Sequence, residues 1–115
     1  MSLAQSIRSS TKWLLAGSLG GQVLHPPTDI PGVGRFGLSI CYDMWFPESI
    51  RALVWQGAEV ILHPTLTNTI DRNIELSMAR ANACMNQCYL VDINSAATMG
   101  VGQSIVAGPG GEVVY

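Results

Sequence analysis

The sequence predicts an α/β fold in which helices connect the strands of a largely parallel sheet. Two apolar runs, residues 36–40 and 58–62, flank a helical segment from Pro47 to about residue 56. Strand, helix and strand thus follow within about 27 residues, which is typical of a βαβ unit with a right-handed crossover. A second helical segment, residues 72–86, is followed by another apolar run at residues 88–93.

The composition indicates which kinds of partner the chain can have. Hydrophobic residues make up 48% of the 115 residues and charged residues 12%, whereas about a quarter charged is usual. We therefore expect part of the surface to be covered by a partner or by further chain. The net charge of −2 and the single lysine, Lys12, argue against binding to nucleic acid or to an anionic membrane.

Three cysteines, an odd number, argue against a disulfide framework and favour a reducing, cytoplasmic location. No apolar run approaches the roughly 20 residues of a membrane span. The first residues lack the apolar core of a signal peptide. We expect no membrane association.

The segments before residue 36 are less regular. Residues 4–11 are polar and suggest the end of a helix, residues 13–16 are strand-like, and the glycine-rich residues 17–21 interrupt the chain. Residues 25–32 contain three prolines, which exclude a helix. We expect them to form an extended connector that enters the strand at Val33 or Arg35.

The first helix is predicted from its ends and its apolar face. Pro47 suits a first helical turn, and Gly57 suits the position after the last. Ile50, Leu53 and Val54 recur at helical spacing and predict the buried face.

The second helix is predicted to begin after Asp71, whose side chain can cap its N-terminus. Four apolar residues are predicted to share one of its faces: Ile74, Met78, Ala81 and Met85. Beyond the strand at 88–93, residues 96–102 form a loop and residues 104–107 a further strand. A turn at 109–111 and the start of another strand at 112–115 complete a hairpin.

Cys41 is the candidate nucleophile. The apolar run ends abruptly at this residue, and polar and aromatic residues lead into the helix. A cysteine at a strand end is accessible, and the following turn offers backbone N–H groups to a developing oxyanion. The alternative is a buried core thiol, which is common but does not require the break in the pattern.

The segment around Cys41 resembles the nucleophile motif of the nitrilase, or carbon–nitrogen hydrolase, superfamily. The matching positions are Gly37, Ile40, Cys41, Tyr42, Asp43, Phe46, Pro47 and Glu48. The resemblance implies a four-layer α-β-β-α sandwich and hydrolysis of a small amide or nitrile through a cysteine thioester or thioimidate. It implies no cofactor and no metal, with assembly as a homodimer or larger oligomer.

The resemblance also assigns roles to residues. Cys41 is expected to attack, and the backbone N–H of Tyr42 to hold the oxyanion. Asp43, Glu48 and Arg51 are expected to support the nucleophile turn, with Glu48 and Arg51 one helical turn apart and able to pair. The alternative for Glu48 is a helix-dipole preference.

Three further residues are expected to line the substrate pocket: Trp45, His63 and Thr65. Plain packing is the alternative for Trp45. His63 follows the second strand and lies at the sheet edge expected to face the ligand. It could form a Cys–His pair, but the superfamily does not use one.

Two residues of the superfamily's site have no counterpart in this chain. Its general-base glutamate and its lysine come from upstream segments, whereas Lys12 precedes a strand and Glu48 follows Cys41. Residues 29–115 follow the second half of the superfamily domain, and residues 4–24 resemble a remnant of the first. We therefore interpret residues 1–115 as a single partial domain and expect it to be inactive alone.

The end of the second helix refines the substrate class. Asn86 and Tyr89 match the superfamily, and Met85 stands where many members have glutamate, which favours the amidase branch. Cys84 and Cys88 are four residues apart, but nothing supplies the further ligands of a metal site, so core packing is expected. A nitrilase acting on nitriles and a non-catalytic interaction module remain the alternatives.

Overall fold

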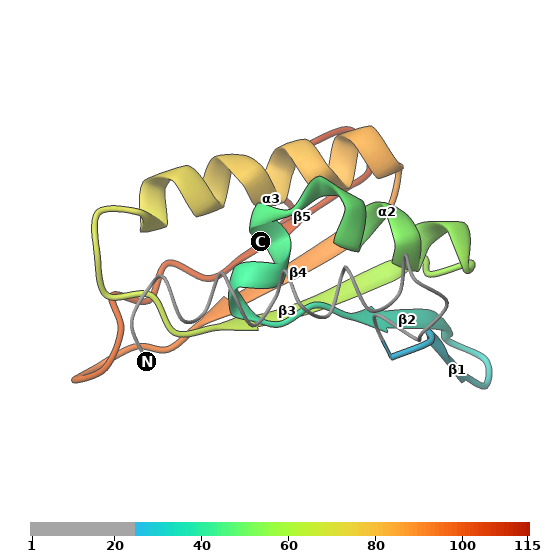
Figure 1. Ribbon diagram of the computed structural model, residues 1–115, viewed down its shortest axis with the longest axis horizontal. Helices are drawn as coiled ribbons and strands as arrows, with labels where there is room; N and C mark the ends of the chain where they lie inside the picture. Colours follow the sequence, from blue (N-terminus) through green and yellow to red (C-terminus); the bar gives the residue numbers. More distant parts are fainter. Residues whose placement is uncertain (1–24) are drawn as a thin grey trace.

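The computed structural model describes residues 25–115. The helix end predicted at residues 4–11, the strand predicted at 13–16 and the remnant proposed at 4–24 lie outside the described residues. The described part forms one five-stranded sheet with two helices on one of its faces (Figure 1). None of its helices is long and apolar enough to cross a lipid bilayer.

The sheet has the order β1-β2-β3-β4-β5, and its three central strands are parallel. The edge strands β1 and β5 run antiparallel to their neighbours. The strand bounds are β1 Thr28–Ile30, β2 Gly34–Leu38, β3 Val60–Thr65, β4 Tyr89–Asn94 and β5 Ile105–Ala107.

The expected extended connector is in fact a short edge strand. In β1, Thr28 pairs with Phe36 of β2, and Val33 N–H donates to Ile30 O (3.0 Å) across the turn. Gly32 adopts a φ of +75°, which glycine tolerates without strain. The prolines lie before the strand and in the turn, where no ladder N–H is required, so they did not prevent pairing.

The βαβ unit is confirmed. Helix α2, Pro47–Trp55, connects β2 to β3, and Phe36 pairs with Val60 in parallel register. Ile50 and Leu53 are fully buried, as their spacing predicted.

Strand β3 is longer than expected and includes His63, Pro64 and Thr65. Pro64 is tolerated because β2 ends at Leu38, so that within residues 25–115 no strand on that side needs its N–H.

Helix α3, Arg72–Asn86, has the predicted bounds but not the predicted buried face. Its buried residues are mostly polar or small: Arg72, Glu75, Ala79, Asn82, Ala83 and Asn86. Ile74 and Met85 are more than half exposed. Of the predicted face, Ala81 is also exposed, and only Met78 is partly buried and packs against the core. The buried face instead combines small residues in the core with polar residues such as Arg72, which pairs with Asp92 of β4.

The predicted side-chain cap of α3 is also absent. Asp71 has helical backbone angles and makes no capping hydrogen bond. Its carboxylate instead accepts a hydrogen bond from the Thr69 hydroxyl (2.9 Å). The Asp71 side chain is thus bonded within the turn before α3 and does not cap the helix.

The predicted C-terminal hairpin is present. Gly111 N–H donates to Gly108 O (2.8 Å) in the turn, and Val113 forms an isolated bridge to Ala107 of β5. Gly111 has a φ of +81°, and a Cβ there would lie 3.3 Å from Cys84 Cβ. Glycine therefore lets the hairpin pack closely against α3.

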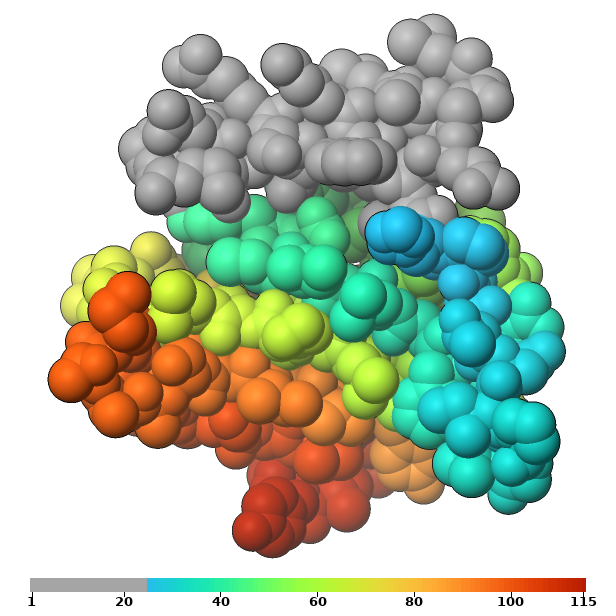
Figure 2. Space-filling model, turned by 90° about the horizontal axis from the view of Figure 1, so that it is seen from below, coloured from blue at the N-terminus to red at the C-terminus, as the bar shows by residue number. Residues whose placement is uncertain are grey.

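The two faces of the sheet differ in their surroundings. The face beneath α2 and α3 holds the core, which comprises Met44, Ile50, Leu53, Ala58, Ile61, Ala79, Ala83, Cys88, Leu90 and Ala107. Figure 2 views the molecule from the opposite side, where the segments follow one another from the blue-green β1 and β2 to the red C-terminal residues. Leu38 and Ile93 are among the exposed apolar residues, as expected for two layers of a larger sandwich.

Candidate active site

Cys41 occupies a strained position at the end of β2. It is the first residue of the short 3₁₀ helix η1, Cys41–Trp45, and its φ is +54°. A non-glycine residue rarely adopts this left-handed conformation, which costs roughly 1–3 kcal/mol and is concentrated at functional sites. The sharp turn leaves the cysteine half-buried at the end of the strand.

Asp43 closes the turn on which Cys41 lies. Its carboxylate Oδ2 accepts a hydrogen bond from Ile40 N–H (3.0 Å), and its own N–H donates to Ile40 O (3.1 Å). The Ser49 hydroxyl donates to Asp43 O and fastens the turn to α2. The bonds between Ile40 and Asp43 join residues on either side of Cys41 in the chain. They therefore stabilise the unfavourable backbone conformation of Cys41.

Tyr42 follows Cys41 on the same turn. The N–H groups of Cys41 and Tyr42 precede the first internal hydrogen bond of η1, so neither has an acceptor within that helix. The Tyr42 ring lies against Trp45, with ring centroids 5.7 Å apart. Burial raises the pKa of the Tyr42 hydroxyl, and the charges of nearby Asp71, Cys41 and Glu75 raise it further.

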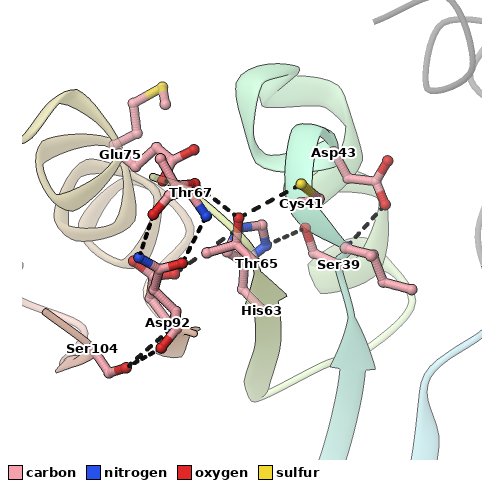
Figure 3. Close-up of polar contacts among 12 residues, drawn as sticks. Ser39, Cys41, Asp43, His63, Thr65, Thr67, Glu75, Asp92 and Ser104 are labelled. Atoms are coloured by element: carbon pink, nitrogen blue, oxygen red, sulfur yellow. Dashed lines mark hydrogen bonds and ion pairs between the residues drawn. The ribbon is translucent and has the colours of Figure 1, made fainter. Parts of the chain in front are cut away.

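The sulfur of Cys41 contacts the end of β3. The Thr65 hydroxyl donates to Cys41 Sγ (3.6 Å) and lies 3.2 Å from the hydroxyl of Thr67. Thr67 in turn donates to Glu75 Oε2 (2.7 Å) on α3, and Trp45 Nε1 donates to Glu75 Oε1 (3.4 Å). Figure 3 shows Cys41, Thr65, Thr67 and Glu75 of this hydrogen-bonded group. Thr65 and Trp45, both predicted site residues, therefore belong to one group with the nucleophile.

Thr67 and Glu75 were not predicted. Thr67 lies in the loop after β3, and the Asn94 side chain hydrogen bonds to both its backbone N–H and its backbone C=O. Asn94 Oδ1 accepts from Thr67 N–H (2.8 Å), and its amide donates to Thr67 O (2.9 Å). The only sequence signal for these residues was their place after a strand and at the start of a helix.

A buried charged layer lies beneath the site, formed by His63, Arg72, Glu75 and Asp92. Arg72 Nη2 is 2.9 Å from Asp92 Oδ2, and Arg72 Nη1 is 3.2 Å from Glu75 Oε2. Arg72 also donates to Gln103 O (2.7 Å) and so connects α3 with the loop before β5. Burial raises the pKa of Asp92 to about 6, although the adjacent Arg72 opposes this shift.

His63 is completely buried within β3 and hydrogen bonds to Ser39, the residue directly after β2, with Nδ1 3.1 Å from Ser39 Oγ. Its Nε2 lies 4.0 Å from Asp92 Oδ1. Burial lowers the pKa of His63 to about 4. The ring is therefore neutral at pH 7, and no ion pair with Asp92 forms there.

The expected pair between Glu48 and Arg51 does not form. Glu48 is exposed, and among the described residues it makes no ion pair with Arg51. Arg51 Nη2 instead donates to Met85 O (3.2 Å) near the C-terminus of α3. The terminal carbonyls of a helix lack internal donors and attract cations, which explains why Arg51 bonds to Met85 O.

The other two cysteines differ in environment. Cys88 is buried in the core, as predicted, and burial raises its pKa to about 11. Cys84 is exposed, so its predicted core packing is wrong. Within residues 25–115, no group of three or more potential ligands is arranged to hold a metal ion.

The arrangement suits nucleophilic chemistry. A half-buried thiol is presented on a sharp turn, with a hydroxyl donor at its sulfur and backbone N–H groups of the same turn beside it. Such a thiol can attack an electrophilic carbon and then depart again from a covalent intermediate.

Comparison with known proteins supports this interpretation. A family model described as carbon-nitrogen hydrolase matches residues 5–115. The chain is 35% identical over 106 residues to the deaminated glutathione amidase of Rattus norvegicus, covering 84% of this chain and 31% of that protein. It is 34% identical to omega-amidase NIT3 of Saccharomyces cerevisiae, covering 70% and 30%. The chain thus spans about a third of the length of the curated relatives it matches.

Solved structures agree with the fold. Nit3 of Saccharomyces cerevisiae, a member of the nitrilase superfamily, matches with a TM-score of 0.69 at 33% identity, covering 76% of this chain and 34% of that chain. A variant amidase from Nesterenkonia sp. AN1 matches with a TM-score of 0.69 at 30% identity, covering 77% and 36%. That structure shows covalent addition of the acetamide moiety of fluoroacetamide at the active-site cysteine.

Proposed function

The chain belongs to the carbon–nitrogen hydrolase family, and we propose that the protein containing it hydrolyses a small-molecule amide with Cys41 as the nucleophile. The principal support is the position of Cys41, at a strand end with a φ of +54° and with a hydroxyl donor at its sulfur. A core thiol would not require such a strained turn.

The proposed reaction proceeds in two steps. Cys41 Sγ attacks the amide carbon and forms a C–S bond, while the backbone N–H of Tyr42 stabilises the oxyanion. The C–N bond breaks, and ammonia or an amine leaves with a proton. Water then attacks the thioester, and the C–S bond breaks to release the acid and restore the thiol.

The remaining predicted residues have supporting roles in this proposal. Thr65 contacts the sulfur, Trp45 is joined to Thr65 through Glu75 and Thr67, and both Thr65 and Trp45 line the substrate pocket. His63, which has no exposed surface, supports the pocket wall from within. Asp43 holds the nucleophile turn through its bond to Ile40 N–H. Glu48 and Arg51 support the turn from α2, and Arg51 also joins α2 to α3 through its bond to Met85 O.

We place residues 29–115 in the nucleophile half of the domain and residues 4–24 in a remnant of the first half. The base and the lysine of the superfamily would then come from segments without a match in this sequence. This division predicts that 115 residues alone release no ammonia. A homodimer or larger assembly and a cytoplasmic location are further parts of the proposal, the latter consistent with three free cysteines.

Intact mass and ammonia release test the proposal together. The purified natural protein should have a mass well above 12.3 kDa, the mass of this chain, and should release ammonia from butyramide. Cys41→Ala should abolish that release while leaving the fold intact by circular dichroism. Ammonia from butyronitrile but not from butyramide would identify a nitrilase, and release from neither would refute the proposed hydrolysis.

A further inference from the structure

Two threonine hydroxyls connect the sulfur of Cys41 to a buried carboxylate (Figure 3). Thr65 Oγ1 lies 3.6 Å from Cys41 Sγ and 3.2 Å from Thr67 Oγ1, and Thr67 Oγ1 lies 2.7 Å from Glu75 Oε2. Both threonines and Glu75 are buried. A buried hydroxyl has one proton to donate, so the direction of each bond in this chain can be derived.

The direction is set at the Glu75 end. Arg72 Nη1 lies 3.2 Å from Oε2, and Trp45 Nε1 donates to Oε1. These donors stabilise the ionised carboxylate, which can only accept hydrogen bonds. The short contact at 2.7 Å is therefore a bond that Thr67 donates to Glu75, and the single proton of Thr67 is not available to Thr65.

The proton of Thr65 has two possible acceptors, Thr67 Oγ1 and Cys41 Sγ. A thiol or thioester sulfur is a weak acceptor, whereas hydrogen bonds to an ionised acceptor are about twice as strong as neutral ones. We propose that Thr65 is a switching donor, whose hydroxyl turns to Cys41 Sγ when the sulfur is negatively charged and to Thr67 when the sulfur is neutral.

This inference rests on the proposed function, in which the sulfur is negative twice. It is a thiolate before it attacks the amide carbon and again when it is expelled from the thioester. In both states the Thr65 hydroxyl stabilises the charge by rotating toward it, and no proton is transferred. Thr65 is thus a catalytic residue that contacts the reacting sulfur, and Thr67 is a positioning residue that competes for the same proton.

The competition predicts opposite effects for two isosteric substitutions. Thr65→Val removes the donor and disfavours the thiolate. Thr67→Val removes the competing acceptor, leaves Thr65 free to donate to sulfur at all times, and favours the thiolate. A chain that merely conducted the thiol proton to Glu75, or merely packed the site, would be impaired in the same direction by both changes.

Alkylation by iodoacetamide between pH 5.5 and 10 measures the thiolate of each cysteine, because the thiolate displaces iodide to form a thioether. Trypsin releases Cys41 alone on residues 36–51, and Cys84 and Cys88 together on residues 81–115. Cys84, which is exposed, serves as a reference thiol, and Cys88, which is buried, reports unfolding of a variant.

We expect Thr65→Val to move the midpoint of the Cys41 profile upward by about one pH unit, a tenfold change in the ratio of thiolate to thiol. Thr65→Ser, which retains the hydroxyl, should restore the wild-type midpoint. Thr67→Val should lower the midpoint, with roughly a fivefold change in that ratio. Titratable groups near Cys41, including Tyr42, Asp43, His63, Asp71 and Glu75, are present in every variant. In Thr67→Val the Glu75 carboxylate loses one donor but keeps those from Arg72 and Trp45.

An unchanged midpoint in Thr65→Val, or an unchanged or raised midpoint in Thr67→Val, would overturn the switching donor. The result is independent of hydrolysis. Opposite midpoint shifts in a protein that releases no ammonia from butyramide would support the switch and refute the proposed function.

Discussion

Two buried groups of the charged layer should make stability depend on pH with opposite signs. Burial lowers the pKa of His63 to about 4. Between about pH 4 and pH 6.5, therefore, the imidazole of His63 binds a proton only in the unfolded chain. Stability therefore rises with pH through this window. The pKa of Asp92 is raised to about 6 by burial, so between about pH 3.8 and 6 only the folded protein binds that proton, and stability falls with pH.

Each effect amounts to about 3 kcal/mol, because one pKa unit corresponds to about 1.4 kcal/mol. In the wild type the two slopes should nearly cancel between pH 4 and 6. His63→Gln removes the rising slope and can keep a hydrogen bond to Ser39. The free energy of unfolding of this variant should fall by about 3 kcal/mol from pH 4 to 6.5, and that of Asp92→Asn should rise by a similar amount.

Urea unfolding followed by far-UV circular dichroism, at half-unit steps of pH, measures these slopes. His25 is the other histidine of the chain and provides the matched control, because it is exposed and His25→Gln should retain the wild-type profile. The assay compares slopes, so a uniform loss of stability in a variant does not affect it. Wild-type slopes in both His63→Gln and Asp92→Asn would refute the assignment to this buried pair.

Three further substitutions test other parts of the structure. Cys41→Gly should be more stable than Cys41→Ala by about 1 kcal/mol, because glycine tolerates a φ of +54°; equal melting temperatures would show that the turn is not strained. Leu53→Ala, in the core, should cost about 2–5 kcal/mol in urea unfolding, whereas Trp55→Ala, on the exposed side of the same helix, should cost under about 1 kcal/mol. Arg72→Met should cost about 3–5 kcal/mol because it leaves two buried carboxylates without their cation; adding Asp92→Asn should recover part of that loss, and no recovery would contradict the ion pair.

The βαβ unit was predictable because its hydrophobic spacing and its burial coincide. Ile50 and Leu53 repeat at helical spacing and are both buried. Helix α3 breaks that correspondence. Its bounds were predictable from local pattern, but its buried face was not, because a pattern method assigns Ile74 to the inside and Arg72 to the outside. The reverse arrangement is stable only because Asp92 on β4 lies opposite Arg72, which local sequence does not show.

The site likewise contains one residue that local sequence predicts and several contacts that it does not. Cys41 was identifiable from the break after its strand and from the motif around it. The bond between Cys41 and Thr65, 24 residues apart, depends on the parallel register of β2 and β3. The path from Thr65 through Thr67 to Glu75 depends further on how α3 packs over the sheet. Such contacts arise from tertiary structure and leave no periodic signal in the chain.

The polar residues on the helix-facing side of the sheet also determine how its strands align. Along β4, Leu90 and Asp92 face the helices, whereas Val91 and Ile93 face the opposite side. A slip of one residue would exchange the two sets. The apolar residues would fit on either face, but Asp92 would lose Arg72 and meet an apolar surface, at a cost of several kcal/mol. The charged layer therefore selects one strand register among several that would bury similar amounts of apolar surface.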